Sequence, residues 1–185
     1  MEPVEVEFLA EKQLITIVPN FSENKLCLIS GEFGPFNPSM HTQVPLWLAL
    51  NLRQRHKCRI EPPQWLNVDT LTEKKREEQE SPVFTKMPSP HYMEVAMLVL
   101  NNAGEDVPRS DEVRALVKDI WDLRVAKLRK SVNIMVLQQE TYAKLDNLTV
   151  MEINTIRSFL TNSLDRLHSM RTPAQMFRGG DDSAF

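Results

Sequence analysis

The residue types that most often carry chemistry are few in this chain and stand apart from one another. The four histidines, His41, His56, His91 and His168, lie in four different segments, and none has a partner at metal-ligand spacing. The five glycines build neither a GxGxxG fingerprint nor a Walker loop, and no Gly-x-Ser-x-Gly elbow occurs. We therefore expect no catalytic residue, no metal site and no cofactor. An enzyme whose site assembles only in three dimensions stays open as an alternative.

Charge, hydropathy and cysteine usage narrow the class of protein further. The formal net charge is −3 with a pI near 5.8, so no global basic field attracts nucleic acid or an anionic membrane. The most apolar stretch, residues 44–52, is far shorter than the roughly 20 residues of a membrane span. Cys27 and Cys58 lie in separate apolar segments, and we expect both to be reduced core thiols of the cytosol or nucleus.

One local cluster of basic residues could contact nucleic acid. It consists of Arg53, Arg55, Lys57 and Arg59, with Trp47 upstream. Cations that bind phosphates beside an aromatic platform can hold a single strand, which makes a single-stranded DNA-binding module the alternative function. The same cations could instead stabilise the end of a helix, cover apolar surface or pair with an acidic partner.

The first third of the chain is β-rich. Short apolar runs at 14–18 and 25–29 predict two strands that form a hairpin, and 57–60 predicts a further strand. Between them, Phe36 is expected to anchor an ordered loop at 31–38, and Pro45 suits the first turn of a short helix.

Helical signals dominate after Pro62 and Pro63. Asn67 can cap a charged, solvated helix that runs to Glu80, and residues 89–90 can start a helix that closes at Gly104. The longest helix should run from Ser110 towards Glu140. A capping box at 149–152 should open a last helix with its apolar face at Ile153, Ile156, Leu160, Leu164, Leu167 and Met170.

Together these elements predict an α+β, mainly α, fold with a small β-rich N-terminal domain followed by a helical-bundle domain. We place the first domain at residues 1–61, the helical domain at 62–172 and a disordered tail at 173–185.

The long helix carries two apolar stripes rather than one. The first is Val113, Val117, Trp121, Val125, Leu128, Val132 and Met135, and the second is Leu116, Ile120 and Leu123. An arc this broad suggests one side for the chain's own core and one for a neighbouring subunit. The candidate interface residues are Leu116, Ile120, Trp121 and Leu128. A helix at the centre of its own bundle would give the same pattern.

Several short motifs, in order along nearly the whole chain, are similar to a known family. They are EVEFLAE at 5–11, IVPNF at 17–21, GPFNP at 34–38, PLWLALNL at 45–52, KCR at 57–59, MPSP at 87–90, LDNLT at 145–149 and MEIN at 151–154. Together they resemble the family of second Psf ("partner of Sld five") subunits of the GINS complex. Residues 69–84 and the segment after Arg171 lie outside these motifs.

The resemblance implies a small B domain, a helical A domain and no active site. It implies a nuclear heterotetramer with Sld five and the first and third Psf subunits. It further implies that this tetramer joins the MCM helicase ring and a RecJ-like helicase activator in DNA replication. From the charge balance and the short apolar stretch we expect any DNA contact to be weak and local, and we expect no membrane contact.

Overall fold

The first part of the chain is organised around a three-stranded antiparallel sheet in the order β4-β1-β5. In the computed structural model, which describes residues 2–138, 146–157 and 161, these strands are β1 (Leu14–Pro19), β4 (Thr42–Pro45) and β5 (Cys58–Glu61). Ile15 lies opposite Val44, and Ile17 lies opposite Ile60. All four of these side chains are buried, so alternation along the strands gives the sheet one apolar face.

The predicted hairpin between residues 14–18 and 25–29 is wrong. β1 is the central strand and pairs with β4 and β5, whereas β2 (Leu26–Leu28) pairs with β3 (Gly31–Phe33) in a separate ribbon. The two runs have similar local texture, but only β1 has the alternating burial of a core strand. Cys27 on this ribbon is exposed, which corrects its assignment to the core, whereas Cys58 is buried; both are free thiols.

The first part of the chain also contains two helices, of which the second packs on the sheet. α2 (Leu46–Gln54) begins directly after Pro45, as expected, and buries Leu46 and Leu50. α1 (Pro3–Ala10) is not predicted by the sequence analysis, although its signals are present. Pro at the first helical position and a capping box between Glu2 and Glu5 start the helix, which buries Val6 and Ala10.

Phe36 is buried and anchors its loop, as predicted, although residues 31–33 of the expected loop form β3. Phe36 has no exposed surface and stacks on Phe21 with ring centroids 5.2 Å apart. Gly34 precedes it at φ 122°, where an added Cβ would lie 3.0 Å from the Asn24 carbonyl oxygen and 3.2 Å from the Phe36 ring. Only glycine fits this turn without displacing its neighbours.

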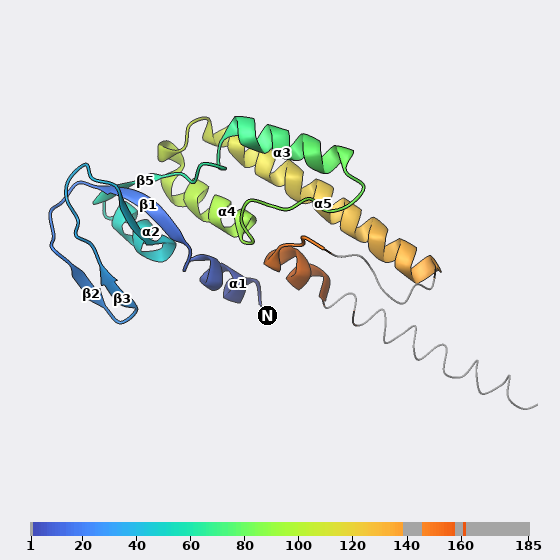
Figure 1. Cartoon of the computed structure of the whole chain (residues 1–185), viewed down its shortest axis with the longest axis horizontal. Helices are drawn as coiled ribbons and strands as arrows, with labels where there is room; N and C mark the ends of the chain where they lie inside the picture. The colour runs from blue at the N-terminus through green and yellow to red at the C-terminus, as the bar shows by residue number, and fades with distance from the viewer. Residues whose placement is uncertain (1, 139–145, 158–160, 162–185) are drawn as a thin grey trace, which may run out of the picture.

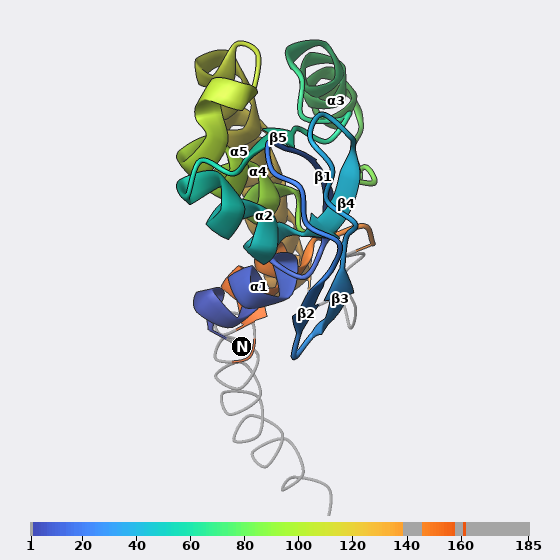
Figure 2. The same cartoon turned by 90° about the vertical axis from the view of Figure 1, so that its left-hand side faces the viewer.

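The second part is helical. Its elements are α3 (Val68–Glu80), α4 (Tyr92–Ala103), the 3₁₀ turn η1 (Gly104–Asp106) and α5 (Ser110–Gln138). Asn67 caps α3 by accepting a hydrogen bond from the Thr70 backbone N–H. α3 packs along α5, and α4 packs against both α5 and α2 (Figures 1 and 2). α5 is the longest helix described, as the sequence predicts.

Residues 150–157 are helical and lie beside α1 and the start of α4 (Figure 1). Half of the predicted capping box is present, because the Thr149 N–H donates to the Glu152 carboxylate at 2.8 Å. Ile153 is exposed and Ile156 is half-buried. The other residues of the expected apolar face, Leu160, Leu164, Leu167 and Met170, lie outside the described residues. So do His168 and the tail at 173–185.

The core is continuous between the sheet and the helices. One cluster of buried apolar side chains extends from Ile17 and Leu46 in the first part to Leu71, Val95 and Ile120 in the second. The sheet therefore does not bury a separate core of its own, and its position fixes that of α4 and α5.

Candidate subunit interface and buried charge cluster

α5 buries a single line of residues that crosses both predicted stripes. The line is Val113, Val117, Ile120, Arg124, Leu128 and Val132, with steps of three or four. Two of the candidate interface residues, Ile120 and Leu128, therefore belong to the chain's own core. The other two, Leu116 and Trp121, are only half-buried and pack at the margin of that core.

A largely apolar groove continues this margin towards the end of α5. It has a volume of about 390 Å³ and lies between α5 and the helical residues 150–157. Its lining consists of Val125, Leu128, Arg129, Val132, Glu152, Thr155 and Ile156. Half-buried Val125 and Ile156 thus present apolar surface on the same side of the chain.

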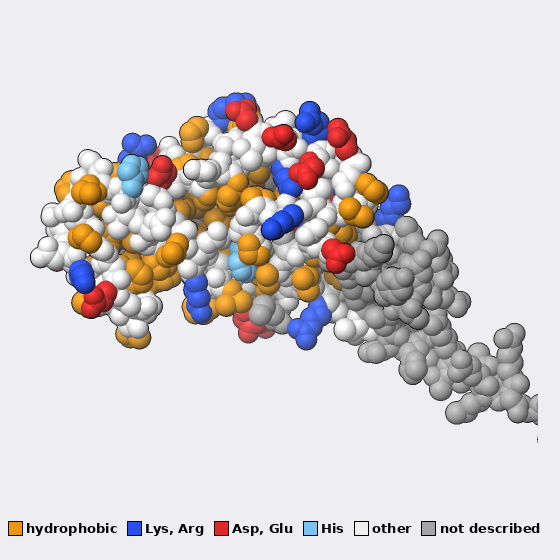
Figure 3. Space-filling view, viewed as in Figure 1, with side chains coloured by type: hydrophobic (Ala, Val, Ile, Leu, Met, Phe, Trp, Pro, Cys, Tyr) orange, Lys and Arg blue, Asp and Glu red, His pale blue; other side chains and the backbone are white. Residues whose placement is uncertain are grey.

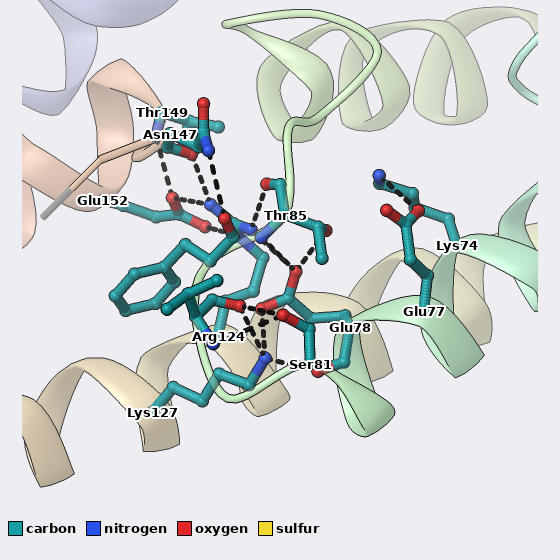
Figure 4. A network of polar contacts seen from close by, with 12 residues as sticks. Lys74, Glu77, Glu78, Ser81, Thr85, Arg124, Lys127, Asn147, Thr149 and Glu152 are labelled. Carbon is teal, nitrogen blue, oxygen red and sulfur yellow. Dashed lines mark hydrogen bonds and ion pairs between the residues drawn. The ribbon is translucent and has the colours of Figure 1, made fainter.

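Arg124 occupies the centre of the buried line on α5 and holds three elements together (Figure 4). Its guanidinium donates to Glu152 at 2.6 and 2.9 Å and to Glu78 on α3 at 3.0 Å. It also donates to the backbone carbonyls of Thr85 at 3.0 Å and Asn147 at 2.8 Å. The side chains of Arg124, Glu78 and Glu152 are fully buried.

Two further side chains complete the environment of Glu78. The Lys127 ammonium lies 2.7 Å from one of its carboxylate oxygens, and the Thr85 hydroxyl donates to the other. Burial alone would raise the pKa of Glu78. The hydrogen bonds from Lys127 and Thr85 and the charge of Arg124 outweigh burial and hold its pKa below the ordinary value.

This cluster is not predicted from the sequence, in which the charged run at 73–80 indicates a solvated face. The structure buries Glu78 there because Arg124 and Lys127 on α5 supply its partners. One signal was available: Arg124 continues the buried line at four residues after Ile120 and four before Leu128. An arginine at such a core position requires buried carboxylates.

A second buried carboxylate is less well satisfied. Glu94 on α4 is buried, and neither of its oxygens accepts a hydrogen bond from the described part of the chain. The Nδ1 atom of the His91 ring lies 3.7 Å from one of these oxygens. Burial therefore raises the pKa of Glu94 above the ordinary value for a glutamate, against the opposing effect of His91.

The predicted basic cluster is split by its surroundings. The Arg53 guanidinium lies 2.9 Å from Asp106, which also accepts a hydrogen bond from the Ile60 N–H at 3.0 Å. Arg59 lies 3.6 Å from the same carboxylate but is exposed, as are Arg55 and Lys57.

The expected aromatic platform does not join these cations. Trp47 lies in the first turn of α2 and packs edge-on against Phe33, whereas Arg53 lies in the last turn and the other three basic residues follow it. The cluster and the aromatic ring are thus at opposite ends of the helix. This arrangement gives the single-stranded DNA-binding alternative no support.

Neither a metal centre nor a membrane span emerges from the described ranges. Within residues 2–138, 146–157 and 161, no three His, Cys, Asp or Glu side chains converge as metal ligands. Across the same part of the chain, no helix has the length and apolar character needed to cross a bilayer. What the geometry does offer is apolar surface along one side of α5.

Comparison with known proteins identifies the family. A family model described as "PSF2 N-terminal domain" matches residues 2–61, and one described as "GINS complex protein helical bundle domain" matches residues 65–171. The human "DNA replication complex GINS protein PSF2" is 55% identical over 95% of both chains, and so is its Xenopus laevis counterpart. The fission yeast protein of that name is 34% identical over 91% of this chain and 90% of its own. The chain therefore belongs to the PSF2 family of GINS proteins.

Proposed function

We propose that this chain is a non-catalytic structural subunit of a GINS complex that acts in DNA replication in the nucleus. The observation that carries the proposal is the similarity to proteins named as PSF2 over nearly their full length. The proposed partners are Sld five and the first and third Psf subunits in a heterotetramer. That tetramer would support the MCM helicase ring together with a RecJ-like activator.

The proposed division into a domain at 1–61 and a helical domain at 62–172 follows the same family. It is supported by the two family models, which match residues 2–61 and 65–171. The continuous core implies that the two parts act as one body, so neither is expected to fold well after separation.

The partly exposed side of α5 is the surface that we propose contacts another subunit. Trp121 and Val125 retain exposed apolar area on the side of α5 that carries the groove, which Ile156 also lines, and half-buried Leu116 borders the buried line on its other side. An apolar surface beside a polar rim is typical of the centre of a subunit interface. Ile120 and Leu128 would act indirectly, by holding the helix in place from the core.

Coexpression with the three proposed partners tests this assignment. We expect Leu116→Glu or Trp121→Glu to leave a folded chain that no longer copurifies with stoichiometric partners. Leu128→Glu should unfold the chain, because it places a charge in a fully packed site. Ala126→Glu, on an exposed position of the same helix that faces away from the groove and the buried line, is the matched control and should do neither.

Circular dichroism separates loss of folding from loss of assembly in each variant. Equal unfolding by Leu116→Glu, Trp121→Glu and Leu128→Glu would mean that α5 is simply the centre of the chain's own bundle. A chain that binds single-stranded DNA tightly by itself, with an affinity that falls steeply as salt rises, would instead favour the nucleic-acid alternative.

A further inference from the structure

The outer face of α1 is apolar, and within the described chain the Lys12 ammonium lies over it, 4.8 Å from the centre of the Phe8 ring. Val6 and Ala10 are fully buried, whereas Val4, Phe8 and Leu9 point outward and are 70%, 59% and 37% exposed. The helix therefore has two apolar faces, of which its own core uses only one. Three large apolar side chains exposed on eight residues of helix exceed the scattered surface residues of an ordinary soluble domain.

A groove of about 440 Å³ begins at this face. Phe8, Glu11 and Lys12 form one wall, Ser30 at the tip of the β2–β3 ribbon forms the other, and Pro45 and Trp47 lie between them. Leu28 and Ile29, next to Ser30, are also exposed. Figure 3 shows hydrophobic side chains gathered on the surface between the ribbon and α1.

The segment that supplies one wall of the groove is acidic, although Glu11 and Lys12 are the two charged residues that line the groove itself. Residues 2–12 carry four glutamates, Glu2, Glu5, Glu7 and Glu11, and a single lysine. The formal net charge of this segment, −3, equals that of the whole chain, so the formal charges of all other residues sum to zero. Glu11 in the groove wall is partly desolvated and lies near Glu7, and both effects raise its pKa.

We propose that this groove is a docking site for a basic segment of another protein that inserts at least one apolar side chain between α1 and the ribbon. The apolar walls require an apolar anchor, and the acidic helix requires cations beside that anchor. A second copy of this chain would set one acidic helix against another. The chain's own residues 162–185 are also a poor match, because their charged side chains sum to zero. The site differs from the α5 surface proposed for assembly.

A photo-crosslinker placed at the groove tests the proposal in the assembled complex. Phe8 is replaced by benzoylphenylalanine in the full chain, expressed in cells with its proposed partners, and the crosslinked peptides are identified by mass spectrometry. We expect a peptide of net positive charge from another protein. The same crosslinker at Val83, which is exposed outside the groove, should not capture that peptide.

Charge reversal supplies the second arm. Glu7→Lys with Glu11→Lys should reduce the crosslink at least about fivefold, because it removes the attraction for a basic segment. Glu73→Lys with Glu80→Lys, exposed on α3, should leave it unchanged.

For each of these variants, recovery of the partner subunits by affinity purification shows that the complex has assembled. If the partner subunits are not recovered, the result counts against the proposed function and not against this docking site. With the complex intact, the proposal is overturned if residue 8 gives no crosslink, crosslinks to another copy or to residues 162–185, or captures a neutral or acidic peptide.

Discussion

Replacing Arg124 with methionine should be among the most damaging single substitutions in this chain. The side chain is fully buried and donates hydrogen bonds to two carboxylates and two backbone carbonyls. Methionine fills a similar volume, so little of the effect will come from a cavity. The loss will come from Glu78 and Glu152, which stay buried without their principal cation.

The expected magnitude is about 3 to 5 kcal/mol of unfolding free energy, the usual cost of removing one partner from a buried ion pair. This is a large share of the roughly 5 to 15 kcal/mol that stabilises a typical domain. Lys127 still forms an ion pair with Glu78 in this variant. We therefore expect a smaller loss of unfolding free energy than if both Glu78 and Glu152 were left buried without any cation.

Urea unfolding followed by circular dichroism at pH 7 measures the effect. Arg129→Met, on an exposed position of the same helix, is the control and should change the unfolding free energy by less than about 0.5 kcal/mol. Arg124→Lys should fall between the two, because lysine keeps the charge but cannot donate to both carboxylates in the same geometry. A loss below about 1 kcal/mol in Arg124→Met would refute the reasoning.

The same variant predicts a pH dependence. In the native chain the pKa of Glu78 is lowered, so its stabilising contribution is present above the ordinary glutamate pKa of 4.5 and is lost as pH falls through the folded value. Arg124→Met removes much of this contribution and leaves carboxylates that gain from protonation. The difference in stability between the two proteins should therefore shrink as pH is lowered from 7 towards 4. A constant difference would show that charge is not the cause.

Four other substitutions or modifications test separate parts of the structure. Glu94→Gln should raise the urea midpoint at pH 7 and have no effect near pH 4, because a glutamate with a raised pKa destabilises the fold only above its ordinary pKa. Iodoacetamide at pH 7.5 should alkylate exposed Cys27 but not Cys58, because burial raises the pKa of the Cys58 thiol to about 11. Equal labelling of the two cysteines, measured by mass spectrometry of the folded chain, would contradict this expectation. Phe36→Ala should cost about 3 to 5 kcal/mol in urea unfolding, and an unchanged midpoint would mean that the loop does not contribute to the core. Asp106→Ala should cost about 1.5 to 3 kcal/mol, since it removes charged hydrogen bonds to Arg53 and the Ile60 N–H, and a loss that is fully reversed by 1 M salt would contradict a buried contact.

The sequence alone determined the features that depend on local chemistry. Asn67 predicted the start of α3 because its side chain can accept a backbone N–H, and α2 begins after Pro45 because the missing N–H of proline costs nothing there. The motifs at residues 5–11, 34–38 and 45–52, taken in order, predicted the family that the comparisons show. Such short-range rules did not give every limit, because α4 begins at Tyr92 and not at the predicted Pro90, and α1 is not predicted.

Tertiary structure decided what depends on residues far apart in the chain. Strand texture at 14–18 and 25–29 could not reveal that β1 pairs with β4 and β5, because pairing is selected by which strands share the core face. Periodicity on α5 gave a broad apolar arc, but only packing against α3 and the helix at 150–157 separated the buried line from the surface beside it. The same packing made Glu78 a core residue, because a carboxylate in a charged run is buried only when a distant Arg124 satisfies it.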